Sequence, residues 1–187
     1  MTCIIGFTDR ANNISWVGGD SLGSDGYVKS AELPAKVFRN ETFKSVLIGG
    51  TTTFRHLDLL KYSEDLFDEV DLYKKTELDH KFMVTQFIPK VIKLFKEGVV
   101  GEIETERGGN FIVATPHRVF EIQPDYSVLE PELGICAVGC GREVAMGEPY
   151  HDHRYGYTTA GQNRHGAESS GAILLRSAKA VPHPVYG

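Results

Sequence analysis

The chain has 187 residues, of which 41% are apolar and 24% are charged, and its net charge at pH 7 is −5. This length favours one domain with a hydrophobic core over two small domains, and the composition excludes a disordered chain. The acidic balance excludes the basic footprint of a general nucleic-acid-binding protein. No apolar run reaches the roughly 18 residues that a membrane helix needs.

The cysteines and the first residues bear on the cellular compartment. Cys3, Cys136 and Cys140 are an odd number of thiols without the spacing of a metal site. The chain does not open with a basic segment followed by an apolar one, which is the pattern of a secretory signal. We therefore expect reduced thiols and a cytoplasmic protein.

Short apolar, β-branched segments near the start predict four strands in two hairpins. Residues 3–9 and 14–20 are joined by the polar turn RANN, and residues 35–40 and 43–50 form the second pair. Between the hairpins, residues 21–34 are rich in Gly and Ser and predict a loop.

Two helices are expected next. Residues 51–67 begin with threonines that can cap a helix N-terminus, and residues 76–98 carry apolar side chains at helical spacing. Gly98 is the stop signal of the second helix. Pro89 falls inside that helix, where it would kink the helix or begin a new first turn.

The remaining segments return to strands. Residues 111–115, 117–123 and 126–131 predict three of them, and residues 134–146 predict a strand, a glycine turn and the start of a helix. Two antiparallel sheets packed face to face, with helices outside, satisfy the whole order of elements.

Thr2 directly follows the initiator methionine and precedes the first predicted strand. If Met1 is removed, Thr2 carries a hydroxyl nucleophile and a free α-amine, whose unperturbed pKa of about 7.7–8.0 suits a general base. A nearby lysine would lower that pKa and stabilise the deprotonated hydroxyl, and a carboxylate would hold the lysine. Lys36 and Asp20 are the candidates, since each lies at the end of a predicted strand.

Five segments in this order, MTCIIGF, WVGGDSLGS, PAKVF, LIGGTT and AVGCGREVAMG, resemble a proteasome β-type subunit, and most closely the HslV-type peptidases. The resemblance covers roughly residues 1–147. It implies an N-terminal nucleophile (Ntn) hydrolase with an α+β fold, a four-layer αββα sandwich of two antiparallel sheets. The implied activity is that of a threonine peptidase, which hydrolyses peptide bonds through an acyl-enzyme on Thr2.

The resemblance also implies roles for individual residues. By position, Thr2 resembles the nucleophile, Asp20 and Lys36 the charge pair, and Gly49 the glycine whose N–H contributes to the oxyanion hole. Cys140 stands where the family usually has a serine, and a thiol is the weaker hydrogen-bond donor. The expected substrate-binding residues are Ser21, Gly50 and Thr51.

The implied partners are a peptide or protein substrate and further copies of the chain in a homo-oligomeric ring, as in the proteasome core complex. The resemblance allows an ATPase unfoldase as a partner, although no residue identifies one. It implies no metal and no organic cofactor, and neither nucleic acid nor a membrane as a partner.

Other interpretations stay open. Cys3 is intrinsically the better nucleophile, but strand alternation directs it away from the face of Thr2, which favours a core position. The chain could be an Ntn amidohydrolase acting on a small amide. It could also be a non-catalytic structural or assembly relative, and retention of Met1 would favour that reading because a blocked amine cannot act as the base.

The sequence changes character at residues 148–187, which we separate from the domain at 1–147 as an atypical C-terminal segment. Its first part shows no period and is crowded with His, Tyr, Gly and Arg. The cluster of His151, Asp152 and His153 matches no metal-site spacing, and flexible polar sequence is the prediction.

The end of the chain lacks the helices and closing strand that the resemblance implies. Residues 172–180, AILLRSAKA, predict only a short helix. Two explanations remain: divergence from the family, or a shift of the reading frame after about residue 146. Shifting the reading by one base permits a helix-forming segment followed by a strand-like one.

Overall fold

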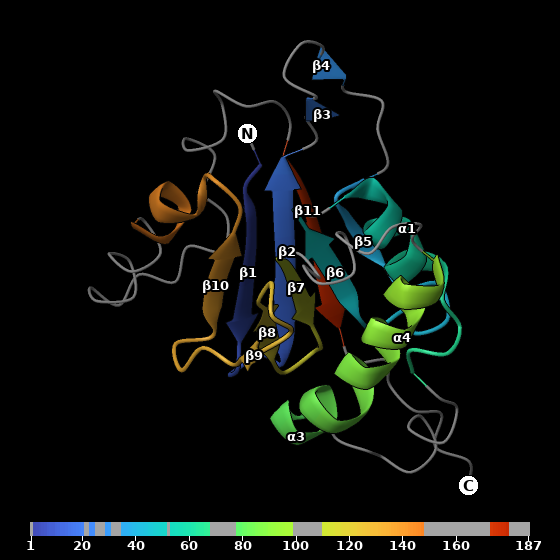
Figure 1. The fold of residues 1–187 in the computed structure, drawn as a ribbon. Helices are drawn as coiled ribbons and strands as arrows, with labels where there is room; N and C mark the ends of the chain where they lie inside the picture. Colours follow the sequence, from blue (N-terminus) through green and yellow to red (C-terminus); the bar gives the residue numbers. More distant parts are fainter. Residues whose placement is uncertain are drawn as a thin grey trace, which may run out of the picture.

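Two antiparallel sheets stand at the centre of the chain (Figure 1). Met1, Ser21, Thr52 and the histidine cluster after residue 150 lie outside the part of the chain that the structure describes. The computed structural model describes residues 2–20, 35–51, 53–67, 78–98 and 110–147, and the backbone of 23–24, 29–30 and 173–179.

The first sheet has four strands in the order β10-β1-β2-β11, all paired antiparallel. Along β1, buried and half-buried residues alternate, which is the period of a strand with one face on the core. The four strands are β1 (Ile4–Asp9), β2 (Ile14–Asp20), β10 (Ile135–Val138) and β11 (Ile173–Lys179).

The second sheet has five strands in sequence order, again antiparallel, and a separate pair joins β3 (Gly23–Ser24) to β4 (Lys29–Ser30). Strands β6, β7 and β8 are buried at every position because both faces of this sheet are covered. The five are β5 (Val37–Arg39), β6 (Leu47–Gly50), β7 (Phe111–Ala114), β8 (Val119–Ile122) and β9 (Val128–Leu129).

Helices form a layer outside the five-stranded sheet (Figure 1). Consecutive residues of β6 separate the two interiors: Leu47 faces the layer between the sheets, and Ile48 faces the helices. A short helix at residues 142–147 follows β10. The labelled helical segments are α1 (Phe54–Tyr62), α3 (His80–Phe82), η1 (Met83–Phe87) and α4 (Ile88–Gly98).

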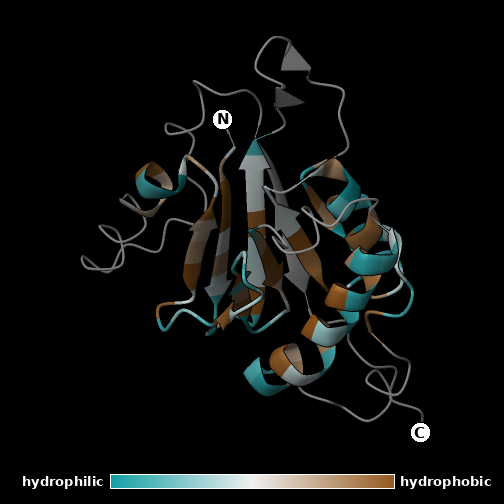
Figure 2. Ribbon diagram, in the orientation of Figure 1, coloured by the Kyte–Doolittle hydropathy of each residue, from teal (hydrophilic) through white to brown (hydrophobic). Residues whose placement is uncertain are grey.

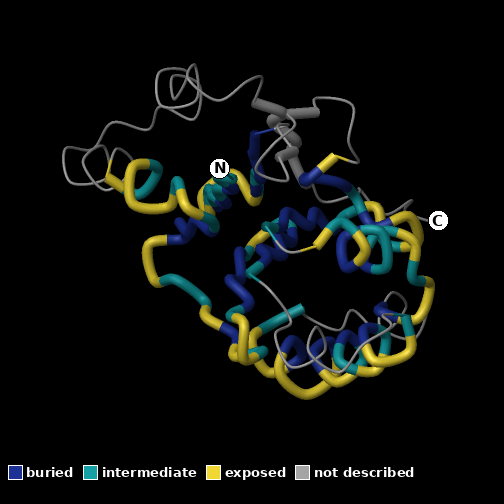
Figure 3. Tube along the Cα trace, turned by 45° about the horizontal axis from the view of Figure 1, so that its top comes forward, coloured by how far each residue is buried: buried dark blue, intermediate teal, exposed yellow. Residues whose placement is uncertain are grey.

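Burial and hydropathy agree with these layers. Apolar residues concentrate on the strands and on the inward sides of the helices (Figure 2), and the exposed residues follow the outer helices and turns (Figure 3). The expected α+β sandwich of two antiparallel sheets is confirmed. Among the described residues, no helix combines the length and the apolar character needed to cross a bilayer.

The predicted helices differ from the observed ones at their ends and around Pro89, and the second begins at His80 and not at residue 76. The first ends at Tyr62 and not at residue 67, because the chain bends there and buries Leu66 and Phe67. Its threonine cap is confirmed, since the side chain of Thr53 accepts the N–H of His56. Pro89 does not interrupt the helix. The helix widens into a π turn at Met83–Phe87, just before Pro89, and this widening avoids the clash that proline makes with the preceding turn.

The expectation of a short helix at residues 172–180 is wrong, because β11 occupies this stretch. It pairs along the whole length of β2, from Ile173 opposite Asp20 to Lys179 opposite Ile14. The edge of β2 offers backbone partners, and this pairing outweighs the intrinsic helix propensity of Ala and Leu, which tertiary context readily overrides. Part of the C-terminal segment therefore joins the first sheet, while the division at residue 147 stays a prediction.

Candidate active site

Thr2, Lys36 and Asp20 form a connected group at one end of the sandwich. The Lys36 ammonium donates to Thr2 Oγ1 at 2.9 Å and to Asp20 Oδ2 at 2.7 Å. The side chains of Lys36 and Asp20 are only 6% and 3% exposed. A buried, charge-neutralised ammonium is thus directed at the threonine hydroxyl.

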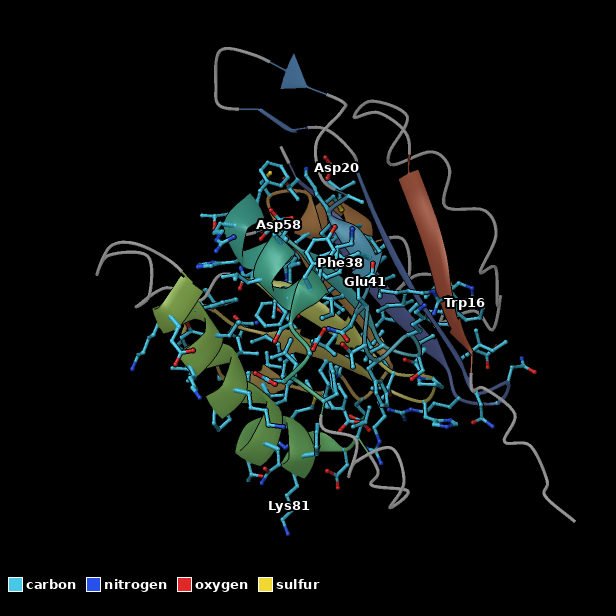
Figure 4. All side chains as sticks on the ribbon, turned by 90° about the vertical axis from the view of Figure 1, so that its right-hand side faces the viewer. Trp16, Asp20, Phe38, Glu41, Asp58 and Lys81 are labelled. Carbon is cyan, nitrogen blue, oxygen red and sulfur yellow. The ribbon has the colours of Figure 1, made fainter. Side chains whose placement is uncertain are left out.

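The first hairpin positions the carboxylate. Asp20 ends β2 beside the start of β1, and its N–H donates to the carbonyl of Cys3 at 3.2 Å. Its Oδ1 accepts the N–H of Cys3 at 2.8 Å, which leaves Oδ2 for Lys36. Figure 4 labels Asp20 at this end of the sandwich and Lys81 at the other. Both carboxylate oxygens are therefore oriented by defined donors.

Lys36 reaches the group from the other sheet. It directly precedes β5, and its carbonyl accepts the N–H of Gly50 from β6 at 3.0 Å. The sheets approach closely at this point because Gly49 has no side chain: an added Cβ would lie 2.7 Å from side-chain atoms of Ile4 and Val17. The group therefore depends on the packing of one sheet against the other.

The turn at residues 139–141, which follows β10, contacts the backbone of Thr2. The N–H of Thr2 donates to Cys140 Sγ at 3.0 Å, and the N–H of Gly141 donates to the Thr2 carbonyl at 3.1 Å. Cys140 Sγ also approaches that carbonyl at 3.5 Å. Gly139 has φ +95°, and a side chain there would overlap the Thr2 carbonyl. Cys140 thus lies directly beside the nitrogen that becomes the α-amine if Met1 is removed.

Three solved structures resemble this chain over nearly its whole length. They are HslV from Trypanosoma brucei (17% identity, TM-score 0.57, covering 95% of this chain and 99% of that one) and two of Thiobacillus denitrificans BPH. BPH alone matches at 18% identity and TM-score 0.61, and the match covers 98% of this chain and 100% of that one. BPH in complex with epoxomicin matches at 18% identity and TM-score 0.62, and the match covers 97% of this chain and 100% of that one. No protein-family model and no curated protein matches the sequence.

The chain has the fold of HslV. The proteasome β-type fold that the five sequence segments implied is therefore confirmed. At these identities the likeness concerns the fold, so any conclusion about the chemistry of the site rests on the geometry of this chain.

The structure shows the strand pairing of Gly49 and Gly50 but does not test their predicted roles. Gly49 pairs with Val37 on one side and Ile112 on the other. Because N–H groups alternate along a strand and that of Gly50 points to Lys36, the N–H of Gly49 points to β7. The oxyanion role of Gly49 stays a prediction, as does that of Gly50 in substrate binding.

Thr51 lies at the edge of the site. Its N–H and its hydroxyl both donate to the carbonyl of Asn110, at 3.0 and 3.1 Å. Its methyl group approaches Gly139, the same glycine that closely approaches the Thr2 carbonyl. Ser21 lies outside the described residues. The position of Thr51 is compatible with a pocket wall, and its role there stays a prediction.

Burial raises the pKa of two of the three thiols, Cys3 and Cys136. Burial raises the pKa of Cys3 above the ordinary value, and electrostatic interactions with Asp20 and Cys140 raise it further. Cys3 is half-buried against Gly141 instead of lying in the core. Burial also raises the pKa of Cys136, which is 2% exposed and a core residue as expected. A raised pKa keeps Cys3 in the unreactive thiol form near neutral pH.

Two residues next to the site were not singled out from the sequence. Glu121 on β8 is buried, and its Oε1 lies 3.1 Å from Nη1 of Arg142, the first residue of the helical turn at 142–147. A charged residue inside the otherwise apolar run VFEI was the available signal, since a buried carboxylate requires a partner. No spacing rule links it to a residue 21 positions later.

Proposed function

We propose that the chain is a threonine-type peptidase that hydrolyses peptide bonds through an acyl-enzyme on Thr2. The observation that carries this proposal is the 2.9 Å contact between Lys36 Nζ and Thr2 Oγ1, with the same ammonium held by Asp20. A fixed positive charge at that distance favours the deprotonated hydroxyl. Peptide hydrolysis through an acyl-enzyme needs such a nucleophile, and the HslV-like fold supports this proposal.

Removal of Met1 completes the catalytic set. The free α-amine of Thr2 then takes the proton from its own hydroxyl, and Oγ1 attacks the carbonyl carbon of the substrate. When the tetrahedral intermediate collapses, the amine returns that proton to the departing amine and an ester remains on Thr2. Water, deprotonated by the same α-amine, then releases the acid and regenerates Thr2.

Three groups assist this sequence in our proposal. Lys36 stabilises the developing negative charge on Oγ1, and Asp20 holds Lys36 in place. Cys140 orients the α-amine through the contact already present at 3.0 Å. Every proton transfer uses a group of the chain itself.

The oxyanion donor is proposed from β6, with Gly49 as the resemblance implies. The N–H of Gly50 donates to the carbonyl of Lys36 and that of Gly49 points to β7, so the resemblance alone supports this role of Gly49. Ser21, Gly50 and Thr51 are the proposed contacts to the peptide.

The proposed setting follows the fold. We place the peptidase in the cytoplasm, since its three cysteines are free thiols. We expect identical copies to assemble into a ring, because an isolated peptidase site would cleave cellular proteins at large. An ATPase unfoldase is the partner that would deliver folded proteins to such a ring.

The test uses epoxomicin, the compound named in the complex with BPH. The intact mass of the protein is measured before and after incubation, with Thr2→Ala as the control. We expect loss of the Met1 mass and one adduct on the native chain, and no adduct on Thr2→Ala. A native chain that keeps Met1 and stays unlabelled would refute the proposal in favour of a non-catalytic relative. Loss of Met1 without an adduct, together with cleavage of small amides, would favour the amidohydrolase.

A further inference from the structure

Glu121 is a buried carboxylate that the proposed mechanism does not use. It lies on β8 in the same cross-strand row as Ile112 and Gly49, so it occupies the layer between the two sheets. Its side chain is 5% exposed, its Oε1 lies 3.1 Å from Nη1 of Arg142, and it accepts from the side-chain amide of Gln123. Such a group has to be compensated by its partners, and Arg142 supplies the charge.

Arg142 connects this carboxylate to the turn that contacts Thr2. Its N–H donates to the carbonyl of Gly139 at 3.1 Å, and the N–H of Ala145 donates to the carbonyl of Gly141 at 3.1 Å. The backbone of Arg142 therefore continues the turn at 139–141, while its side chain reaches the other sheet. The side chain is 48% exposed, so the ion pair lies at the margin of the interior.

We infer that the ion pair between Glu121 and Arg142 positions the turn at 139–141 against Thr2. The connection runs from β8 through Arg142 to Gly141 and Cys140, and from these to the carbonyl and the nitrogen of Thr2. It joins the two sheets at the catalytic end, next to the nitrogen that acts as the base. This inference rests on the proposed function for its catalytic consequence, although the positioning itself is a property of the fold.

The catalytic consequence follows from the distances. Without Arg142, the turn loses its side-chain attachment to β8 and keeps only its own backbone bonds and its contacts with Thr2. Cys140 then holds the α-amine less well, so the amine is misplaced relative to the hydroxyl it has to deprotonate. Misplacement by about 1 Å costs up to about a hundredfold in rate. Neither Glu121 nor Arg142 contacts Thr2 directly, so both are positioning residues.

A second ion pair offers a matched control. Arg118 Nη1 lies 2.9 Å from Glu130 Oε1, and both side chains are partly buried. Arg118 sits in the turn between β7 and β8, at the end of β7 opposite to Phe111, which pairs with Gly50. Breaking this pair tests the general effect of losing a partly buried ion pair in the same sheet without touching the turn at 139–141.

The experiment uses three test variants: Arg142→Met, Glu121→Gln and the double variant that carries both changes. Arg118→Met is the control. Each is assayed as the full chain for turnover of a fluorogenic peptide that depends on Thr2, and for amide hydrogen exchange at Gly141. We expect Arg142→Met to lower kcat about tenfold or more with little change in KM. The double variant with Arg142→Met and Glu121→Gln should have the same kcat as Arg142→Met alone, because both changes break the same connection. Arg142→Lys should restore part of the rate.

Hydrogen exchange separates the two proposals. The N–H of Gly141 donates to Thr2, so its protection should fall in Arg142→Met and stay unchanged in Arg118→Met. If the native chain shows no turnover that depends on Thr2, the proposed function fails, and the Gly141 exchange decides the positioning by itself. Arg142→Met with the rate and the protection of Arg118→Met would overturn the inference. Circular dichroism confirms folding, and the doubly changed chain leaves no unpaired buried charge.

Discussion

The ammonium of Lys36 lies 2.9 Å from the hydroxyl of Thr2, although 34 positions and a change of sheet separate the two residues. The same ammonium is 2.7 Å from Asp20, so one buried cation is shared by a carboxylate and a hydroxyl. This arrangement ties stability and chemistry to the same atoms. Substitutions that separate the two effects are therefore the most informative.

Changes to Lys36 and Asp20 should separate folding from activity. Lys36→Met leaves the Asp20 carboxylate buried without its cation, which should cost about 3–5 kcal/mol of unfolding free energy. Asp20→Asn combined with Lys36→Met should recover most of that stability, since no buried charge is left unpaired. Activity should be absent from both variants. Urea denaturation and a peptide assay measure the two effects, and an active double variant would contradict the role of Lys36.

Cys140 should make the site sensitive to thiol reagents. Its Sγ is exposed and lies 3.0 Å from the nitrogen of Thr2, so an alkyl group on it would occupy the space beside the base. N-ethylmaleimide should abolish labelling by epoxomicin in the native chain. Cys140→Ser should remain active and resist the reagent, because a hydroxyl keeps the hydrogen bond. Equal sensitivity of the native chain and Cys140→Ser would show that another group is responsible.

Gly139 and Gly134 form a matched pair of left-handed glycines. Their φ values are +95° and +67°, so alanine should cost each about 1–2 kcal/mol in backbone strain. Only the Cβ at 139 would overlap the carbonyl of Thr2. We therefore expect Gly139→Ala to lose activity as well as stability, and Gly134→Ala to lose stability alone. The melting temperature and the peptide assay together check this, and an active Gly139→Ala would contradict it.

Stability should fall at alkaline pH because of Cys136. Burial raises the pKa of its thiol, so the folded chain keeps a proton that the unfolded chain releases above pH of about 8.5. The stabilisation is fully present below that pH and is lost as the pH rises, by about 1.4 kcal/mol per unit for one proton. Unfolding free energies between pH 8 and 10 should decline less steeply in Cys136→Ala. Parallel slopes would exclude this thiol as the cause.

The local sequence pattern was sufficient to predict those elements whose structure depends on residues close in sequence. A strand within residues 3–9, a threonine cap on the first helix and the strand, glycine turn and helix around Cys140 were all predicted, and each is observed. The π turn before Pro89 and the strand β11 were not predicted. In both, packing or an open sheet edge overrode a local preference that pointed elsewhere.

By itself, the sequence determined the order of the main strands and helices up to residue 146 and singled out Thr2, Asp20 and Lys36, because periodicity, caps and residue type act over a few positions. Only the tertiary structure decided that Cys140 meets a residue 138 positions away, and that Glu121 meets Arg142 across two sheets. Such contacts depend on how closely the sheets approach and on which buried charge lacks a partner. Those properties arise only when the layers pack, since burial is what makes an unpaired carboxylate unfavourable.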